Sequence, residues 1–270
     1  MIKIRNIHKC FNPGTVNEVY ALQGVNLDVA DGDFITIIGT NGSGKSTLLN
    51  GIAGSFLPDE GRIEIDGRDV TRKHDFQRAH FISRVFQNPF QGTAPGMTIA
   101  ENLHMAGLRG KPSLPKLGLN HKRLEFFREQ VKALEMQLED RLDDVIGTLS
   151  GGQRQALSLL MAVIAEPKVL LLDEHTAALD PKSAAQVIKL TRKFVGKNQL
   201  TTIMVTHSMQ QAIDLGNRTV MMNKGKIIDD ISAKEKKRVT VDDLLNKFVE
   251  IRKQEQLTDE LLADLRREYA

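Results

Sequence analysis

The 270-residue sequence has one cysteine, no tryptophan and few aromatic residues, which make up 5% of the chain. A single cysteine, Cys10, cannot form a disulfide within the chain, and such cysteine usage is typical of a reducing cytoplasm. The scarcity of aromatic side chains argues against a surface that stacks single-stranded bases. The net charge of +3 is too small to indicate a protein that binds nucleic acid.

Long hydrophobic runs are also missing. No apolar stretch approaches the roughly 20 residues that a membrane-spanning helix needs. The first ten residues, MIKIRNIHKC, lack the apolar core of a signal peptide. A role at a membrane would therefore need another chain for the spanning part. The length and the 41% hydrophobic content suit one large α/β unit or a core with an inserted subdomain.

A glycine-rich segment separates two regular stretches. Residues 34–38, FITII, predict a buried strand, and residues 46–53 have helical spacing. Between them GTNGSGKS fits the pattern G-x-x-x-x-G-K-[ST] in the context that it requires. The backbone N–H groups of such a loop bind phosphate oxygens. We expect Lys45 to reach the β- and γ-phosphates of a nucleotide and Ser46 to bind Mg²⁺; the alternative is a glycine-rich turn that fits the pattern by chance.

A pair of acids follows another apolar run. Residues 169–172, VLLL, predict a parallel strand buried on both faces, and Asp173 and Glu174 come directly after it. We expect Asp173 to hold Mg²⁺ through water. Glu174 would polarise the attacking water as a general base, a role worth about 10²- to 10⁴-fold in rate. The alternative is that both acids cap the next helix.

The pentapeptide LSGGQ at residues 149–153 resembles the signature of the ATP-binding cassette (ABC) ATPases, and other motifs match in family order. The resemblance covers residues 1–231, the predicted ATPase domain. It implies an α/β P-loop NTPase fold with a mainly parallel core sheet, an antiparallel β subdomain and an α-helical subdomain inserted at about residues 88–165. It also implies that the chain hydrolyses ATP with Mg²⁺.

Several single residues take roles from this resemblance. Phe11 would stack on adenine, with a core aromatic at a strand end as the alternative. Gln87 would contact Mg²⁺ or the attacking water and report the nucleotide state to the next segment. His207 would contact the γ-phosphate, and a buried core histidine is its alternative. His175 stands where the family usually has proline; we expect it to be a solvated turn residue, and a second polar contact near the site is the alternative.

The signature residues would form a second anion site at a helix N-terminus. In the family this site meets the γ-phosphate of the other protomer, which implies a head-to-tail homodimer. The candidate nucleotide-binding residues are Phe11, Gly39, Asn41, Gly42, Ser43, Gly44, Lys45, Ser46, Thr47, Ser150, Gly151, Gly152, Gln153 and Asp180. The candidate catalytic residues are Lys45, Gln87, Glu174 and His207, and the candidate metal ligands are Ser46, Gln87 and Asp173.

Residues 88–103 correspond to the family's groove for the coupling helix of a transmembrane partner. Phe90, Met97 and Ile99 are the candidate apolar contacts, and burial in the subdomain core is their alternative. No glutamate-rich stretch of the kind that exporters carry precedes the signature, which favours an importer. The resemblance thus implies a peripheral subunit on the cytoplasmic face of the membrane, with integral permease subunits and an extracytoplasmic solute-binding protein as partners and no nucleic acid.

The transported substrate would not contact this chain, so no residue of the sequence identifies the class of substrate. The nearest resemblance is to ATPases of bacterial amino-acid uptake systems, and the predicted function is to energise import of a small solute. Two alternatives stay open. One is an exporter ATPase for lipids or lipoproteins, and the other is a soluble ABC ATPase of cytosolic iron–sulfur cluster assembly.

The remaining segments give local expectations. Residues 2–7, 19–29 and 62–67 predict antiparallel strands, and residues 123–136 predict a helix with Leu134 on its apolar face. Residues 110–120, GKPSLPKLGLN, predict an exposed insertion. Residues 232–270 predict a C-terminal helical extension: a solvated charge run, AKEKKR, then a helix capped by Thr240 and a further helix from Thr258. We expect these helices to pack on the core; a role in dimerisation or regulation is the alternative.

Overall fold

The computed structural model describes residues 1–110 and 119–254 of the chain. A six-stranded sheet lies at its centre in the order β10-β9-β3-β8-β7-β6. Every neighbouring pair is parallel except β9 and β10, as the predicted parallel core requires. Its strands are β3 (Phe34–Gly39), β6 (Ile82–Val85), β7 (Val169–Asp173), β8 (Thr201–Val205), β9 (Arg218–Asn223) and β10 (Lys226–Ile231). All residues of β3, β7 and β8 are buried, because the sheet is covered on both faces.

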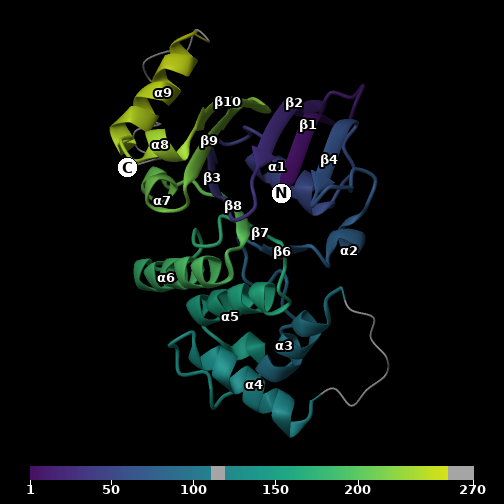
Figure 1. The fold of residues 1–270 in the computed structure, drawn as a ribbon, viewed down its shortest axis with the longest axis vertical. Coiled ribbons are helices and arrows are strands. Elements are labelled where there is room, and N and C mark those ends of the chain that lie inside the picture. Colours follow the sequence, from purple (N-terminus) through teal and green to yellow (C-terminus); the bar gives the residue numbers. More distant parts are fainter. Residues whose placement is uncertain (111–118, 255–270) are drawn as a thin grey trace.

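A second, antiparallel sheet has the order β2-β1-β4-β5 and lies at the upper right of Figure 1. Its strands are β1 (Ile2–Phe11), β2 (Val19–Val29), β4 (Glu60–Ile65) and β5 (Arg68–Asp69), which confirms the predicted antiparallel strands. Helix α1 (Lys45–Ala53) shares one apolar core with both sheets, through Leu48, Leu49 and Ile52. The glycine loop therefore sits where the two sheets meet.

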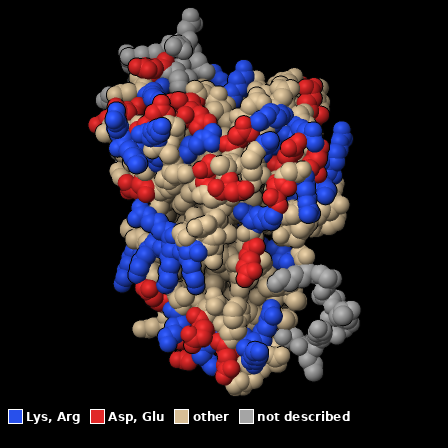
Figure 2. All heavy atoms as spheres, in the orientation of Figure 1, with Lys and Arg blue, Asp and Glu red and all other residues tan. Residues whose placement is uncertain are grey.

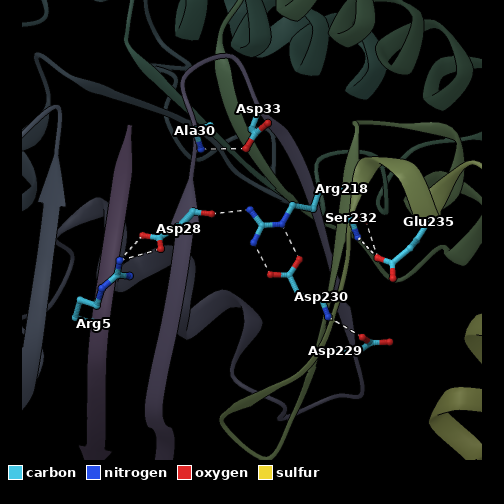
Figure 3. Close-up of polar contacts among 9 residues, drawn as sticks. All are labelled: Arg5, Asp28, Ala30, Asp33, Arg218, Asp229, Asp230, Ser232 and Glu235. Atoms are coloured by element: carbon cyan, nitrogen blue, oxygen red, sulfur yellow. Dashed lines mark hydrogen bonds and ion pairs between the residues drawn. The ribbon is translucent and has the colours of Figure 1, made fainter.

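One arginine ties the two sheets together at their edge (Figure 3). The Nε atom of Arg218 on β9 donates to Asp230 Oδ1 on β10 at 2.6 Å, and Nη1 donates to the backbone oxygen of Asp28 on β2 at 2.6 Å. Arg5 on β1 in turn pairs with the carboxylate of Asp28. The chain of contacts holds β1, β2, β9 and β10 in one arrangement.

Helices α5 and α6 lie below the central sheet in Figure 1, and α3 and α4 lie at the lower end of the molecule. Helices α5 and α6 share one apolar core with α3 and α4. The elements are α2 (Asp75–Arg78), α3 (Ile99–Leu108), α4 (His121–Lys132), a short 3₁₀ turn η1 (Ile146–Thr148), α5 (Gly151–Ile164), α6 (Pro181–Asn198) and α7 (Met209–Asp214). Helix α3 carries the predicted groove residue Ile99, which is fully buried, so that apolar contact belongs to the core.

Helix α4 ends earlier than the sequence pattern predicts. The apolar face includes buried Phe127 and Val131 as expected, but the helix stops at Lys132 and Leu134 is buried beyond its end. Glu135 and Gln137 both have φ of 57°, and two left-handed residues cannot continue a right-handed helix. The predicted insertion at residues 110–120 lies mostly outside the described residues.

The described part of the C-terminal extension, residues 232–254, packs on the core, as expected. Helices α8 (Ala233–Lys236) and α9 (Val241–Gln254) follow β10, and Thr240 caps α9 by accepting from the backbone N–H of Asp243 at 3.2 Å. Leu244 and Phe248 are buried in one cluster with Ile38 of β3. The further helix predicted from Thr258 lies outside the described residues.

The prediction that the charge run AKEKKR is solvated is wrong at Lys236. Lys236 is only 7% exposed, and its ammonium group donates to the backbone oxygen of Leu215 and to Thr36 Oγ1. Burial lowers the pKa of Lys236 to about 8. None of the helices in the described part of the chain combines the length and apolar character that crossing a bilayer requires.

Candidate functional site

The glycine loop joins β3 to α1 with a backbone that other residues could not adopt. Gly42 and Gly44 have φ of 75° and 97°. A Cβ atom on Gly44 would lie 2.5 Å from the backbone oxygen of Ala21, and one on Gly39 would lie 2.3 Å from that of Met222. Glycine is required at these positions because the loop has left-handed turns and close neighbours. The loop delivers the chain into the N-terminus of α1, where backbone N–H groups have no partner within the helix.

Two polar side chains of the loop fit a phosphate group. Lys45 is 5% exposed, and its ammonium donates to the backbone oxygens of Gly39 at 2.7 Å and Thr40 at 3.0 Å. The buried hydroxyl of Ser43 has no hydrogen-bond partner among residues 1–110 and 119–254. A buried hydroxyl without a partner is costly, and an oxyanion bound in the loop would satisfy it.

A cavity of about 160 Å³ opens in front of this loop. It is lined by seven predicted nucleotide- or metal-binding residues together with both predicted catalytic side chains from the sheet edge: Asn41, Gly42, Ser43, Gly44, Lys45, Ser46, Thr47, Glu174 and His207. The structure thus brings together residues that lie more than 100 positions apart in the sequence. The ends of parallel strands meet at one edge of the sheet, and that edge is where such folds bind ligands.

Glu174 and His207 are in direct contact. Glu174 Oε1 lies 2.5 Å from His207 Nε2, and the Glu174 side chain is only 11% exposed. The two residues follow the neighbouring strands β7 and β8, and the backbone N–H of Glu174 donates to the Val205 oxygen at 3.0 Å. Glu174 has φ of 46°, a left-handed conformation that is uncommon for residues other than glycine and that directs the chain sharply after the strand.

Asp173 lies between two partners. Ser46 Oγ donates to Asp173 Oδ1 at 3.2 Å, and Arg84 of β6 pairs with Oδ2 at 2.6 Å. A hydroxyl and a carboxylate side by side are the hard oxygen ligands that Mg²⁺ prefers, so the residues present fit this ion. Arg84 was not among the predicted site residues. The available signal was a cation within the mostly apolar run FISRVF.

Gln211 is a second residue that sequence reasoning missed. Its side-chain Nε2 donates to Thr176 Oγ1 at 3.2 Å, and its Oε1 accepts from Thr206 Oγ1 at 3.0 Å. Thr176 comes two residues after Glu174, and Thr206 comes one residue before His207. A single amide group from α7 therefore holds together the two segments that carry the catalytic candidates.

His175 is not the solvated turn residue that we expected. It is 1% exposed, and its Nε2 lies 3.0 Å from Thr191 Oγ1 on α6. The Thr191 hydroxyl donates to the Val187 oxygen, so Nε2 is the nitrogen that carries the proton. Burial lowers the pKa of His175 to about 4 and keeps the ring neutral.

Phe11 and Gln87 lie outside the cavity. Phe11 ends β1 and is 37% exposed, with its ring edge-on to Phe56 at 5.5 Å, so the alternative of a core aromatic is wrong. Gln87 is exposed, two residues after the end of β6.

The signature residues form a separate cavity in the same chain. Ser150 is the N-cap of α5 and exchanges hydrogen bonds with Gln153, and Asp180 caps α6. Ser150 and Gln153 line a cavity of about 460 Å³ with Lys182, a cavity whose lining shares no residue with that of the glycine loop. Gly151 and Gly152 form the first turn of α5.

Helix α6 borders this second cavity through Lys182, Ser183 and Gln186 and is basic along its exposed face. Its exposed residues include five cations and no acid, and Figure 2 shows the resulting blue cluster beside the central part of the molecule. The cations are Lys182, Lys189, Arg192, Lys193 and Lys197. Lys189 and Lys193 pair with Glu135, which also lines the cavity, and the positive charge of Lys182 favours the approach of an anionic ligand.

Comparison with known proteins identifies the family. The family model described as "ABC transporter" matches residues 22–177, more than half of the chain. The chain belongs to the ABC transporter family. The tyrosine transport ATP-binding protein of Clostridioides difficile (strain R20291) is 45% identical over 250 residues, which cover 92% of this chain and 98% of that protein. The probable sulfate/thiosulfate import ATP-binding protein CysA of Chlorella vulgaris is 38% identical over 87% of this chain and 92% of that protein.

Solved ABC cassettes have the same fold. The dimeric post-hydrolysis state of the ATP-binding cassette MJ0796, bound to ADP and Pi, aligns with a TM-score of 0.73 and 29% identity over 86% of this chain and 99% of that chain. The predicted family and the predicted P-loop NTPase fold are thereby confirmed. As an ABC ATPase, the chain binds ATP with Mg²⁺ and hydrolyses it.

Proposed function

We propose that this chain is the ATP-hydrolysing subunit of an ABC importer for a small solute, working as a head-to-tail homodimer. The observation that carries the proposal is the Glu174–His207 contact at 2.5 Å on the wall of the glycine-loop cavity. The close relatives are named for tyrosine transport and for sulfate/thiosulfate import, and the former makes an amino acid the first substrate to test.

Each residue of the first half-site has a chemical task in this proposal. Lys45, the Ser43 hydroxyl and the loop N–H groups bind phosphate oxygens. Ser46 and Asp173 hold Mg²⁺, with Gln87 reaching in from the next segment; when bound, the ion neutralises phosphate charge. Glu174 accepts a proton from the water that attacks the terminal phosphorus, while the bond from that phosphorus to the bridging oxygen breaks.

The second half-site supports the proposed dimer. Ser150 and its helix N-terminus lie in a cavity that shares no lining residue with the glycine loop of the same chain. A nucleotide held by one protomer would therefore meet the signature of the other. Differential binding of ATP to the closed pair would drive dimerisation, and hydrolysis would release it.

A third cavity, of about 460 Å³, is the proposed docking site of the permease. Its lining comes from the end of α1, from α2, from β6 and its following segment, and from α5. Ala53, Phe76, Phe86 and Met161 give it an apolar wall, and Phe76 is 74% exposed. Exposed aromatic side chains beside a concave apolar surface are typical of a protein–protein contact. The full complex would include integral permease subunits on the membrane and an extracytoplasmic solute-binding protein.

The test uses a variant that binds ATP and cannot hydrolyse it. Tagged Glu174→Gln, with ATP and Mg²⁺, is added to detergent-solubilised membranes of the source cell, and the proteins that copurify are identified. We expect a dimer that retains a multi-spanning protein and a solute-binding protein. The matched control is Glu174→Gln combined with Lys45→Ala, which should stay monomeric. Capture of soluble scaffold proteins alone, or a strictly monomeric Glu174→Gln at saturating ATP, would contradict the proposal.

A further inference from the structure

The carboxylate of Asp173 needs a counter-charge and a fixed orientation. Its side chain is 13% exposed at the end of β7, and an unpaired carboxylate at such depth is strongly unfavourable. Arg84 supplies the charge at 2.6 Å through Oδ2, which leaves Oδ1 directed at Ser46. The two oxygens are thus divided between an arginine and the predicted metal ligand.

Arg84 is itself held from three directions. One guanidinium nitrogen pairs with Asp173, another donates to Asn50 Oδ1 of α1, and the group stacks on the Phe86 ring at 4.5 Å from its centroid. Asn50 lies four residues after Ser46, on the same face of α1. The planar fork of arginine can bridge α1 and β7 in this way, whereas the single ammonium of lysine cannot fill both directions with the same geometry.

The same guanidinium reaches the proposed docking cavity. Arg84 and Phe86 both line the cavity of about 460 Å³, whose lining includes no residue of the glycine loop. One side chain therefore contacts the carboxylate of the metal site at one end and the wall of the docking cavity at the other. Gln87 follows two residues after the end of β6, the strand that carries Arg84.

We propose that Arg84 is a positioning residue that orients Asp173 for the metal and couples the metal site to the docking cavity. The inference rests on the proposed metal role of Asp173. A partner segment seated in the cavity would touch the group that sets the orientation of this carboxylate. By reciprocity, binding of metal and nucleotide would change the cavity wall at Arg84 and Phe86.

The first test measures metal affinity without turnover. Electron paramagnetic resonance with Mn²⁺ and ADP gives the affinity for the ion, and ADP binding in EDTA gives the affinity without it. We expect Arg84→Gln to weaken Mn²⁺ binding by about 10- to 100-fold, the usual cost of losing a partner of a metal-binding carboxylate. ADP binding in EDTA should be unchanged, and Arg84→Lys should lie between Arg84→Gln and the unaltered protein.

Arg109 provides a matched control. Its Nη1 donates to Ser83 Oγ on β6 at 2.7 Å, and it lines the same cavity as Arg84, but this partner is a hydroxyl and not a carboxylate. Arg109→Gln therefore disturbs the same strand and the same wall, and should leave Mn²⁺ affinity unchanged. Equal losses in the two variants would overturn the positioning role. Thermal unfolding of each variant verifies that it is folded.

Asp173→Asn distinguishes a failure of the role of Arg84 from a failure of the proposed metal site. If Asp173→Asn weakens Mn²⁺ binding and Arg84→Gln does not, the role of Arg84 is wrong and the metal site stands. If Asp173→Asn has no effect on Mn²⁺ binding, the proposed metal site itself is wrong.

The second test measures whether binding of Mn²⁺ and ADP changes the docking cavity. Gln91 is an exposed residue of the cavity lining, and Cys10 is the only cysteine of the chain. Gln91→Cys in a Cys10→Ser background takes a polarity-sensitive fluorophore, whose emission should shift when Mn²⁺ and ADP bind. The shift should be lost with Arg84→Gln at saturating Mn²⁺ and kept with Arg109→Gln. A shift that persists in Arg84→Gln, or no shift in the unaltered site, would overturn the coupling.

Discussion

Gln211 Oε1 accepts a hydrogen bond from the hydroxyl of Thr206 at 3.0 Å, one residue before His207. The other end of the same amide donates to Thr176, two residues after Glu174. The position of the Glu174–His207 pair therefore depends on a side chain that is outside the cavity lining.

Gln211→Ala should lower the ATPase kcat by about 10- to 100-fold, because small misplacements of catalytic groups cost that much. ATP affinity should be retained, since Gln211 lies away from the glycine loop. The measurement is steady-state ATPase activity with ATP binding measured in parallel. The control is Gln210→Ala on the same helix, where the exposed side chain donates to Asp214 Oδ1 and not to the segments that carry Glu174 and His207. Equal activity of the two variants would show that the bridge has no positioning role.

Lys45→Ala should abolish the ATPase. The ammonium group is buried in the loop beside the cavity, and loss of one such electrostatic contact costs about 10²- to 10³-fold in kcat. Phosphate release at saturating ATP and Mg²⁺ is the measurement. Lys197→Ala, at an exposed position on α6, serves as the control. Turnover near the unaltered rate in Lys45→Ala would refute the phosphate-binding assignment.

Phe11→Ala should weaken ATP binding through loss of stacking on adenine. Base–aromatic stacking is worth about 1–3 kcal/mol, which corresponds to about 5- to 150-fold in Kd. The effect should disappear with a triphosphate that lacks a base. Phe126→Ala on α4 removes a ring that is 48% exposed, similar to Phe11, and should leave binding unchanged. An equal loss with both ligands would contradict the stacking role.

His175 should make the protein sensitive to acid. Its pKa is lowered from 6.5 to about 4, so below pH 6.5 the unfolded chain takes up a proton that the folded chain refuses. The free energy of unfolding should thus fall by about 3 kcal/mol from this residue as the pH drops from 6.5 to 4. Urea unfolding across this range should show a shallower pH dependence for His175→Gln. His121→Gln, at an exposed histidine, should behave like the unaltered protein.

The parts of the site that local pattern determines were predictable. The glycine loop, the acids after β7 and His207 after β8 are each set by an apolar run that ends in polar residues. Arg84, Gln211 and the burial of His175 were not, because each depends on a neighbour distant in sequence: Asp173, Thr176 and Thr191 respectively. The predicted roles of the site residues and the domain boundaries remain predictions.

Segment ends were predicted less well than segment types, for a similar reason. The apolar face of α4 was clear, but its end depends on left-handed residues at Glu135 and Gln137 that carry no glycine signal. Lys236 belongs to a run that looks solvated, and it is buried because β3 and the end of α7 approach it. Tertiary packing decides both cases.

The pairing of β3 has a consequence for how the chain is made. Phe34 pairs with Thr202 and Ile35 with Arg218. The strand that leads into the glycine loop therefore cannot pair until these residues, near the other end of the chain, have been synthesised. The β1–β2 hairpin can form early during synthesis, whereas the central sheet closes only when β8 and β9 have left the ribosome. Such non-local pairing is slow and leaves apolar strand edges open in the meantime. The nascent chain therefore acquires its ATP site late, and a truncation before β9 would leave β3 with one edge unpaired.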